Sequence, residues 1–162
     1  MLDYQFVTVR LAVGGAIWTS ENMRAVARAG ITHIVNLQQE FDDRTIAEGT
    51  GVEIRWVPCE DDWLPKPAWF FWDGVRFALE ALKNPQARVL VHCAAGVHRG
   101  PMMLLAMLRA LGYGSESARG MIATARPQAE FPDVYLESVE GFIHEYHSDN
   151  GYNPTTPFSE IR

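Results

Sequence analysis

The apolar positions of the chain fall into two alternating patterns. Short runs rich in β-branched residues predict buried strands, and they occupy residues 6–9, 11–13, 31–37, 52–57 and 89–91. Longer segments in which apolar residues recur every three or four positions predict helices, and they occupy residues 20–29, 67–83, 101–111, 115–125 and 132–146, with a short helix between residues 44 and 49. Strands that alternate with helices predict one α/β domain with a central, mostly parallel sheet of four to five strands, flanked by helices.

Two of these helices and the end of the chain indicate how the domain is arranged. Residues 67–83 carry apolar side chains mainly on one helical face, whereas residues 101–111 are apolar on nearly all sides. We therefore expect the second of these helices to lie buried in the centre of the domain. Residues 148–162 are rich in Gly, Asn, Pro and Thr, so we predict a domain of residues 1–147 followed by a C-terminal tail.

Composition narrows the classes of function. The chain has 162 residues, of which 48% are hydrophobic, and a formal net charge of −6. An acidic chain of this kind argues against nucleic-acid binding and against a polybasic membrane surface. Its two cysteines make no disulfide framework, its first residues lack the pattern of a signal peptide, and its longest apolar run, residues 102–108, is too short to cross a bilayer. We expect a cytoplasmic monomer.

Candidate chemistry is concentrated in residues 88–101, where a buried strand leads through a tight turn into a helix. Cys93 lies at the end of the strand, where backbone N–H groups and the helix dipole favour a bound anion and favour thiolate over thiol. Gly96 permits the twist that turns successive amides inward. Arg99 can fold back and present two parallel N–H donors to a tetrahedral oxyanion. Residues 93–99, here called the cradle, therefore predict a phosphate site with a sulfur nucleophile at its floor.

The cradle and the residue before it read His92-Cys93-Ala94-Ala95-Gly96-Val97-His98-Arg99. This stretch resembles the His-Cys-x5-Arg signature of the cysteine-dependent phosphatases of the protein tyrosine phosphatase superfamily, and with its flanks it is most similar to the dual-specificity branch. The similarity extends from about Val13 to about Phe142. In this interpretation Cys93 attacks phosphorus, and the side chain of Arg99 and the amides of residues 94–99 hold the phosphoryl oxygens. His92 is expected to tune the thiolate through hydrogen bonds rather than to act as an acid.

Two positions depart from the family pattern. Most dual-specificity phosphatases have Ser or Thr after the arginine, where the hydroxyl helps the sulfur to leave during hydrolysis of the phospho-cysteine, but this chain has Gly100. The departure concerns the rate of the second chemical step and not the binding of phosphate. Asp133 stands where the family usually has Asn, so a hydrogen bond that supports the cradle is expected to differ.

The proposed reaction also needs a carboxyl group, which protonates the leaving oxygen and later activates water. The carboxyl ends of parallel strands share one edge of a sheet, so residues 58–67, here called the acid loop, should face the cradle. Residues 57–61 resemble the acid segment of the family, and Asp61 precedes Cys93 by 32 residues, a spacing similar to the usual one. We predict that Asp61 is the general acid. Asp62 is the alternative, and a merely solvated acidic turn is the structural alternative.

Other side chains near these loops allow both a structural and a functional interpretation. Trp63 and Trp69 either wall the substrate entrance or pack against the acid loop. Cys59 is either a small core residue or a partner for a reversible disulfide with the cradle cysteine. Asp42 and Asp43 are predicted to form a solvated helix start.

The function predicted from the sequence is hydrolysis of phosphomonoesters through a phospho-cysteine intermediate. The resemblance implies phosphotyrosine and phosphoserine or phosphothreonine in a protein as substrates. No metal or cofactor is expected, because arginine and backbone dipoles supply the positive charge. The lack of lysines in the cradle disfavours polyanionic inositol lipids. Alternatives are a phosphatase of phosphoglycans or other small phosphomonoesters, a sulfurtransferase, an arsenate reductase, or a phosphate-binding protein without turnover.

Overall fold

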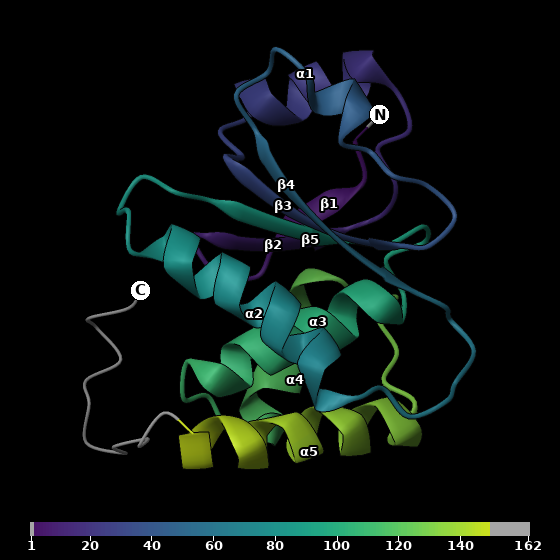
Figure 1. Ribbon diagram of the computed structural model, residues 1–162, viewed down its shortest axis with the longest axis vertical. Coiled ribbons are helices and arrows are strands. Elements are labelled where there is room, and N and C mark those ends of the chain that lie inside the picture. The colour runs from purple at the N-terminus through teal and green to yellow at the C-terminus, as the bar shows by residue number, and fades with distance from the viewer. Residues whose placement is uncertain (1, 150–162) are drawn as a thin grey trace.

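The computed structural model describes residues 2–149, which form a sheet between two layers of helices (Figure 1). The five strands are β1 (Tyr4–Phe6), β2 (Leu11–Gly14), β3 (His33–Gln38), β4 (Glu53–Cys59) and β5 (Val89–His92). Their order across the sheet is β1-β2-β5-β3-β4, in which β1 is antiparallel to β2 and all other neighbours are parallel. The prediction of an α/β domain with a central, mostly parallel sheet is confirmed.

The helices divide unevenly between the two faces of the sheet. They are α1 (Ser20–Arg28), α2 (Ala68–Leu82), α3 (Arg99–Ala110), α4 (Ser115–Ala125) and α5 (Asp133–Asp149), with a short 3-10 helix η1 (Thr45–Ala47). Figure 1 shows α1 on one side of the sheet and α2 to α5 on the other. Within residues 2–149, every helix is too short or too polar to span a bilayer.

The alternation of side chains along the buried strands produces two cores, because successive residues of a strand point to opposite faces. Val89 and Val91 of β5 pack in the larger core with α2 to α5, whereas Leu90 packs in the smaller core with α1. Helix α3 contacts three strands as well as α2, α4 and α5. Residues 100–108 of α3 are all buried, as the apolar sequence of this helix predicts. The cradle thus connects a central strand to a central helix, and the buried packing of β5 and α3 fixes its two ends.

The first strand differs from the prediction. Its observed position is residues 4–6 rather than 6–9, because the chain reverses immediately afterwards. The backbone N–H groups of Val7 and Thr8 both donate to the carbonyl of Leu11, at 2.8 and 3.1 Å. Val9 is exposed at this turn, so its apolar character does not indicate a buried strand.

The end of the domain also differs from the predicted boundary. Helix α5 continues through Asp149, so the first two residues of the expected tail are helical. The rest of the expected tail, residues 150–162, lies outside the described residues.

Candidate active site

The backbone of the cradle is turned so that its carbonyl groups point outward. The four carbonyls of residues 94–97 accept hydrogen bonds from outside the cradle at 2.7 to 2.9 Å, and their donors are the backbone N–H groups of Ala16 and Glu130 and the guanidinium of Arg126. In a planar trans peptide the N–H group points opposite to the carbonyl of the preceding residue. The amides that follow these carbonyls therefore face the inside of the loop, where converging N–H groups form a site for an anion.

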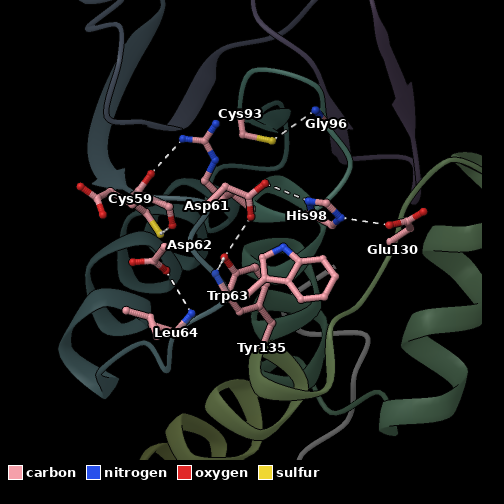
Figure 2. Close-up of polar contacts among 12 residues, drawn as sticks. Cys59, Asp61, Asp62, Trp63, Leu64, Cys93, Gly96, His98, Glu130 and Tyr135 are labelled. Carbon is pink, nitrogen blue, oxygen red and sulfur yellow. Dashed lines mark hydrogen bonds and ion pairs between the residues drawn. The ribbon is translucent and has the colours of Figure 1, made fainter.

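Cys93 lies at the floor of this loop. Its side chain is 2% exposed, and its Sγ accepts the N–H of Gly96 at 3.2 Å (Figure 2). Gly96 has φ of +66°, and a Cβ atom there would lie 2.4 Å from Nη2 of Arg126 and 2.7 Å from the backbone of Gly14. Only glycine can occupy this position without a clash. Because α3 begins directly after the loop, the N-terminus of a helix adds its positive potential at the sulfur.

Arg99 is held from one side only. Its Nη1 donates to Oε2 of Glu40 and to the carbonyl of Cys59, both at 2.9 Å, and its Nη2 donates to Oε1 of Glu40 at 2.8 Å. Nε of Arg99 is buried and has no partner among the described residues. Since a guanidinium has five N–H donors in a fixed plane, the edge formed by Nε and Nη2 is available to an oxyanion in a two-bond fork.

Glu40 and Arg99 each stabilise the charged form of the other. The hydrogen bonds from Arg99 lower the pKa of Glu40 to about 2, against a smaller opposing effect of burial. The Arg99 side chain is only 9% exposed. Glu40 therefore stays ionised at neutral pH and holds the guanidinium in one orientation.

The acid loop places Asp61 beside the cradle. Oδ2 of Asp61 lies 2.8 Å from Nδ1 of His98, and Oδ1 accepts the hydroxyl of Tyr135 at 2.9 Å (Figure 2). The same tyrosine oxygen accepts the backbone N–H of Trp63 at 3.1 Å. Burial, together with the nearby Asp61, raises the pKa of Tyr135, so its hydroxyl stays protonated as a donor.

Asp62 is directed to other partners. Its Oδ1 accepts Nζ of Lys66 at 2.5 Å and the backbone N–H of Leu64 at 3.1 Å. Figure 2 shows the Asp62 and Leu64 pair on the side of the acid loop away from Cys93. Of the two adjacent carboxylates, this geometry brings Asp61 to the cradle.

A hollow of about 350 Å³ lies between the acid loop and the segment that follows β3. It is lined by Gln39, Glu40, Glu60, Asp61 and Arg99. Arg99 is the one cation in this lining, and three carboxylates surround it. The site can therefore bind a single phosphoryl group at Arg99, while its rim carries negative charge.

His92 is buried, and its side chain faces away from the inside of the cradle toward a carboxylate that the sequence did not reveal as its partner. Its Nε2 lies 2.7 Å from Oδ2 of Asp43, and its Nδ1 lies 3.2 Å from the carbonyl of Cys93. Asp43 is 0% exposed and its Oδ1 also accepts Nδ2 of Asn36 at 3.0 Å. The prediction of Asp43 as a solvated helix start is therefore wrong. Only Asp42 matches it, in an exposed pair with Arg44.

Replacing Asp43 with Ala should destabilise the domain by about 2–4 kcal/mol, because two buried polar partners would lose their acceptor. The matched control is Asp42→Ala, which removes an exposed ion pair and should cost less than about 1 kcal/mol. Urea unfolding of both variants measures the difference. Equal losses for the two variants would contradict the buried role of Asp43.

Trp63 and Trp69, which were predicted either to wall the substrate entrance or to pack against the acid loop, lie in different places. Trp63 is exposed and its ring contacts the His98 imidazole edge to face, with centroids 5.5 Å apart. Trp69 is exposed on α2, where it lines a separate hollow with Trp72 and Asp73. The structure therefore brings Trp63 to the cradle and places Trp69 elsewhere.

Cys59 is a free, buried thiol in β4 whose Sγ donates to the carbonyl of Glu60 at 3.2 Å. Burial raises the pKa of its thiol to about 11, so it is neutral at physiological pH. Its carbonyl, and not its sulfur, contacts Arg99. The reversible disulfide with Cys93 stays a prediction.

Several residues that shape the site were not singled out from the sequence. They are Glu40, Tyr135 and Glu130, together with the buried Asp43. Each contacts a cradle or acid-loop residue, or His92, that is at least 30 positions away in the sequence. The altered hydrogen bond expected at Asp133 stays a prediction. The turn before α5 contacts the cradle through the backbone N–H of Glu130, which donates to the carbonyl of Val97 at 2.8 Å. The guanidinium of Arg126 also shapes the site, because it donates to the outward carbonyls of Ala95 and Gly96.

The site combines a buried cysteine, inward-facing backbone amides and an arginine with a free two-donor edge, all in one strand-to-helix loop. This combination is typical of the class of cysteine-dependent phosphatases. The family model of the dual specificity phosphatase catalytic domain matches residues 17–133. The chain belongs to this family, and the resemblance stated from its motif is confirmed.

Curated relatives are similar over part of their length. Dual specificity protein phosphatase 13B of Homo sapiens is 33% identical over 98 residues, which cover 58% of this chain and 50% of that protein. Dual specificity protein phosphatase 26 of Bos taurus is 34% identical over 91 residues, which cover 55% of this chain and 43% of that protein. The match therefore spans about half the length of these relatives.

Solved structures share the fold over nearly the whole chain. PTPMT1, solved in complex with PI(5)P, has a TM-score of 0.79 at 21% identity, covering 91% of this chain and 98% of that one. Human DUSP28 has a TM-score of 0.76 at 23% identity, covering 90% and 99%. At these identities the comparison supports the shared fold alone.

Proposed function

We propose that this protein hydrolyses phosphomonoesters through a phospho-cysteine intermediate. Cys93 attacks phosphorus, and Arg99 with the amides of residues 94–99 holds the three equatorial oxygens. Asp61 protonates the departing oxygen and then activates the water that releases phosphate. The positive charge comes from the guanidinium, the backbone dipoles and the α3 N-terminus.

One observation carries this proposal. The buried Nε of Arg99 has no hydrogen-bond partner among residues 2–149, although Nη1 and Nη2 donate to Glu40 and to the Cys59 carbonyl. A buried, unsatisfied charged donor costs free energy, and a bound tetrahedral oxyanion would satisfy it. The same loop carries Cys93 with an N–H aimed at its sulfur. Oxyanion binding and a nucleophile are thus combined in seven consecutive residues.

We propose phosphotyrosine and phosphoserine or phosphothreonine in proteins as the preferred substrates, with phosphoglycans or other small phosphomonoesters as the second candidate. The acidic rim supports this choice, because Glu40, Glu60, Asp61 and Glu130 would repel the additional phosphates of an inositol lipid. The neighbour solved with PI(5)P makes a lipid headgroup the alternative to test.

The decisive experiment is a side-by-side assay of phosphate release from phosphotyrosine and phosphothreonine peptides, a sugar phosphate and PI(5)P. Vanadate should inhibit turnover, because it occupies the same oxyanion site. We expect the peptides to give the highest kcat/KM. A preference for PI(5)P would contradict the proposed substrate class, and a lack of turnover with retained phosphate binding would indicate a binding protein.

The assignment of the acid is tested by Asp61→Asn, with Asp62→Asn as its matched control. Loss of a general acid should lower kcat on a phosphotyrosine peptide by about 10²-fold or more, and less for an aryl phosphate with an activated leaving group. Asp62 pairs with Lys66 instead, so its variant should lose less than about threefold. Equal losses would contradict the assignment of Asp61.

Gly100 allows the second chemical step to be tested. A Cβ atom there would lie 3.4 Å from Cγ2 of Val13 and 3.6 Å from Sγ of Cys93, which are ordinary contacts. In Gly100→Ser a hydroxyl could therefore donate to the sulfur as it leaves phosphorus. Hydrogen bonds to charged groups are worth about 1.5–3 kcal/mol, so kcat should rise by about tenfold. An unchanged kcat, with a pre-steady-state burst still visible, would contradict this.

A further inference from the structure

The imidazole of His98 connects three parts of the chain that are distant in sequence. His98 immediately precedes α3, and its side chain makes no capping hydrogen bond to that helix. Its Nδ1 lies 2.8 Å from Oδ2 of Asp61 in the acid loop, and its Nε2 lies 3.0 Å from Oε2 of Glu130 in the turn before α5 (Figure 2). The ring is thus placed between two carboxylates and rests against the Trp63 ring.

These contacts indicate where the pair of His98 and Asp61 holds its proton. Both oxygens of Asp61 face a hydrogen-bond donor, because Tyr135 occupies Oδ1 and Nδ1 of His98 occupies Oδ2. A general acid must have a proton to give to the leaving oxygen, and this arrangement places a candidate proton source next to Asp61. A proton on Nδ1 of His98 already lies in the hydrogen bond to Asp61, and a second one on Nε2 would face Glu130. The geometry is that of an imidazolium between two carboxylates.

We propose that His98 is a positioning residue that holds Asp61 over the cradle and stores the proton that Asp61 passes to the leaving group. This inference rests on the proposed function. It assigns to the side chain of His98 a role separate from that of its backbone amide. Glu130 supports the role by stabilising the charged ring from the opposite side.

Over one turnover the pair of His98 and Asp61 gives up one proton and regains one. In the first step the sulfur–phosphorus bond forms while the phosphorus–oxygen bond breaks; Asp61 gives a proton to the departing oxygen and receives one from Nδ1 of His98. In the second step water attacks phosphorus and the thiolate leaves. The proton of the water passes to Asp61 and back to His98, so the enzyme returns to its starting state.

The surroundings of His98 determine how this pair responds to pH. The titratable and charged groups that face His98 or its partner Asp61 are Asp61 itself, Glu130, Tyr135 and Arg99. Partial burial lowers the pKa of His98, but the hydrogen bonds and charges of Asp61 and Glu130 outweigh this effect, and the pKa is raised. Because the raised pKa keeps the ring charged to higher pH, the pair retains its proton near neutrality. Aspartic acids on their own ordinarily ionise near pH ~4.

The test compares His98→Asn with His98→Ala. An asparagine amide can replace the Nδ1 donor and keep Asp61 in place, but it holds no titratable proton. For a phosphotyrosine peptide, we expect the high-pH limb of kcat/KM to move down by about one pH unit or more in both variants. At acidic pH, His98→Asn should be more active than His98→Ala. The loss near neutrality should be about tenfold or more, and smaller for an activated aryl phosphate.

The matched control is His33→Asn, which removes a histidine whose Nε2 lies 3.6 Å from Glu53 on the far edge strand. It should leave the pH profile unchanged. A His98→Asn profile that superimposes on the wild type would overturn the inference while turnover and vanadate inhibition leave the proposed function intact. Glu130→Gln gives a second variant, with a smaller shift in the same direction.

A readout that needs no turnover separates this inference from the proposed function. In NMR titrations the His98 imidazole should lose its proton at higher pH in the wild type than in Asp61→Asn, because the variant lacks the facing carboxylate. Identical titrations would overturn the pairing. If the pairing is observed but no substrate is hydrolysed, it is the proposed function that fails.

Discussion

Cys93→Ser should lose about 10⁴-fold or more of kcat on every phosphomonoester that the wild type hydrolyses, because a serine hydroxyl at this position has no base to activate it. The inward amides and the open edge of Arg99 would remain. The variant should therefore still bind inorganic phosphate or a phosphopeptide, which isothermal titration measures. Loss of turnover with retained binding is the combined result that identifies the sulfur as the nucleophile.

The chain contains its own control for this substitution. Cys59→Ser makes the same chemical change at a buried thiol whose sulfur points to the Glu60 carbonyl and not to Arg99. Its kcat should stay within about threefold of the wild type. A comparable collapse of activity in both variants would mean that Cys93→Ser acts by disturbing the fold. Residual turnover in Cys93→Ser above about a hundredth of the wild type would contradict covalent catalysis by this residue.

The fold could be predicted from the sequence because the patterns that indicate its strands and helices are local. Alternation along buried strands such as Val89 to Val91, and the nearly continuous apolar sequence of α3, depend only on neighbouring residues. The first strand was misplaced for the same reason. The apolar Val9 fits the alternation, but the reversal of the chain at Leu11 depends on a turn that alternation does not detect.

The sequence predicted only part of the site, and there is a physical reason why the other part could not be predicted. Cys93, Gly96 and Arg99 lie in one loop between a buried strand and a helix, so this local stretch of sequence predicts an oxyanion cradle. The groups that hold the reactive side chains come from distant segments that only the folded sheet brings together. Asp43 is the clearest case, because a carboxylate in a polar stretch is normally solvated, and only its burial beside His92 shows otherwise.

The Glu40 and Arg99 pair shows how the domain prepares a charged side chain for its ligand. An arginine free to rotate would have to lose rotamer entropy when phosphate binds. Here Glu40 and the Cys59 carbonyl already hold one side of the guanidinium, and the Nε edge is left for the ligand. The charge of Glu40 also offsets that of Arg99. In the proposed reaction this should weaken the binding of product phosphate and favour its release.

Arg99→Lys should therefore lower kcat/KM by about 10³-fold or more, although the charge is retained. A lysine offers a point charge in place of a planar fork, so it cannot satisfy Glu40 and two phosphoryl oxygens together. The matched control is Arg109→Lys, which alters a two-bond pair with Glu140 away from the cradle. It should leave kcat/KM within about twofold.

The division of this loss between kcat and KM tests what Arg99 recognises. The equatorial oxygens spread apart as phosphorus passes between oxygen and sulfur, and a rigid fork that is half held by Glu40 can match that geometry better than the tetrahedral ground state. We expect most of the loss in Arg99→Lys to appear in kcat, with a smaller rise in KM. A loss confined to KM would mean that the guanidinium binds substrate and transition state equally, and that the inward amides alone distinguish them.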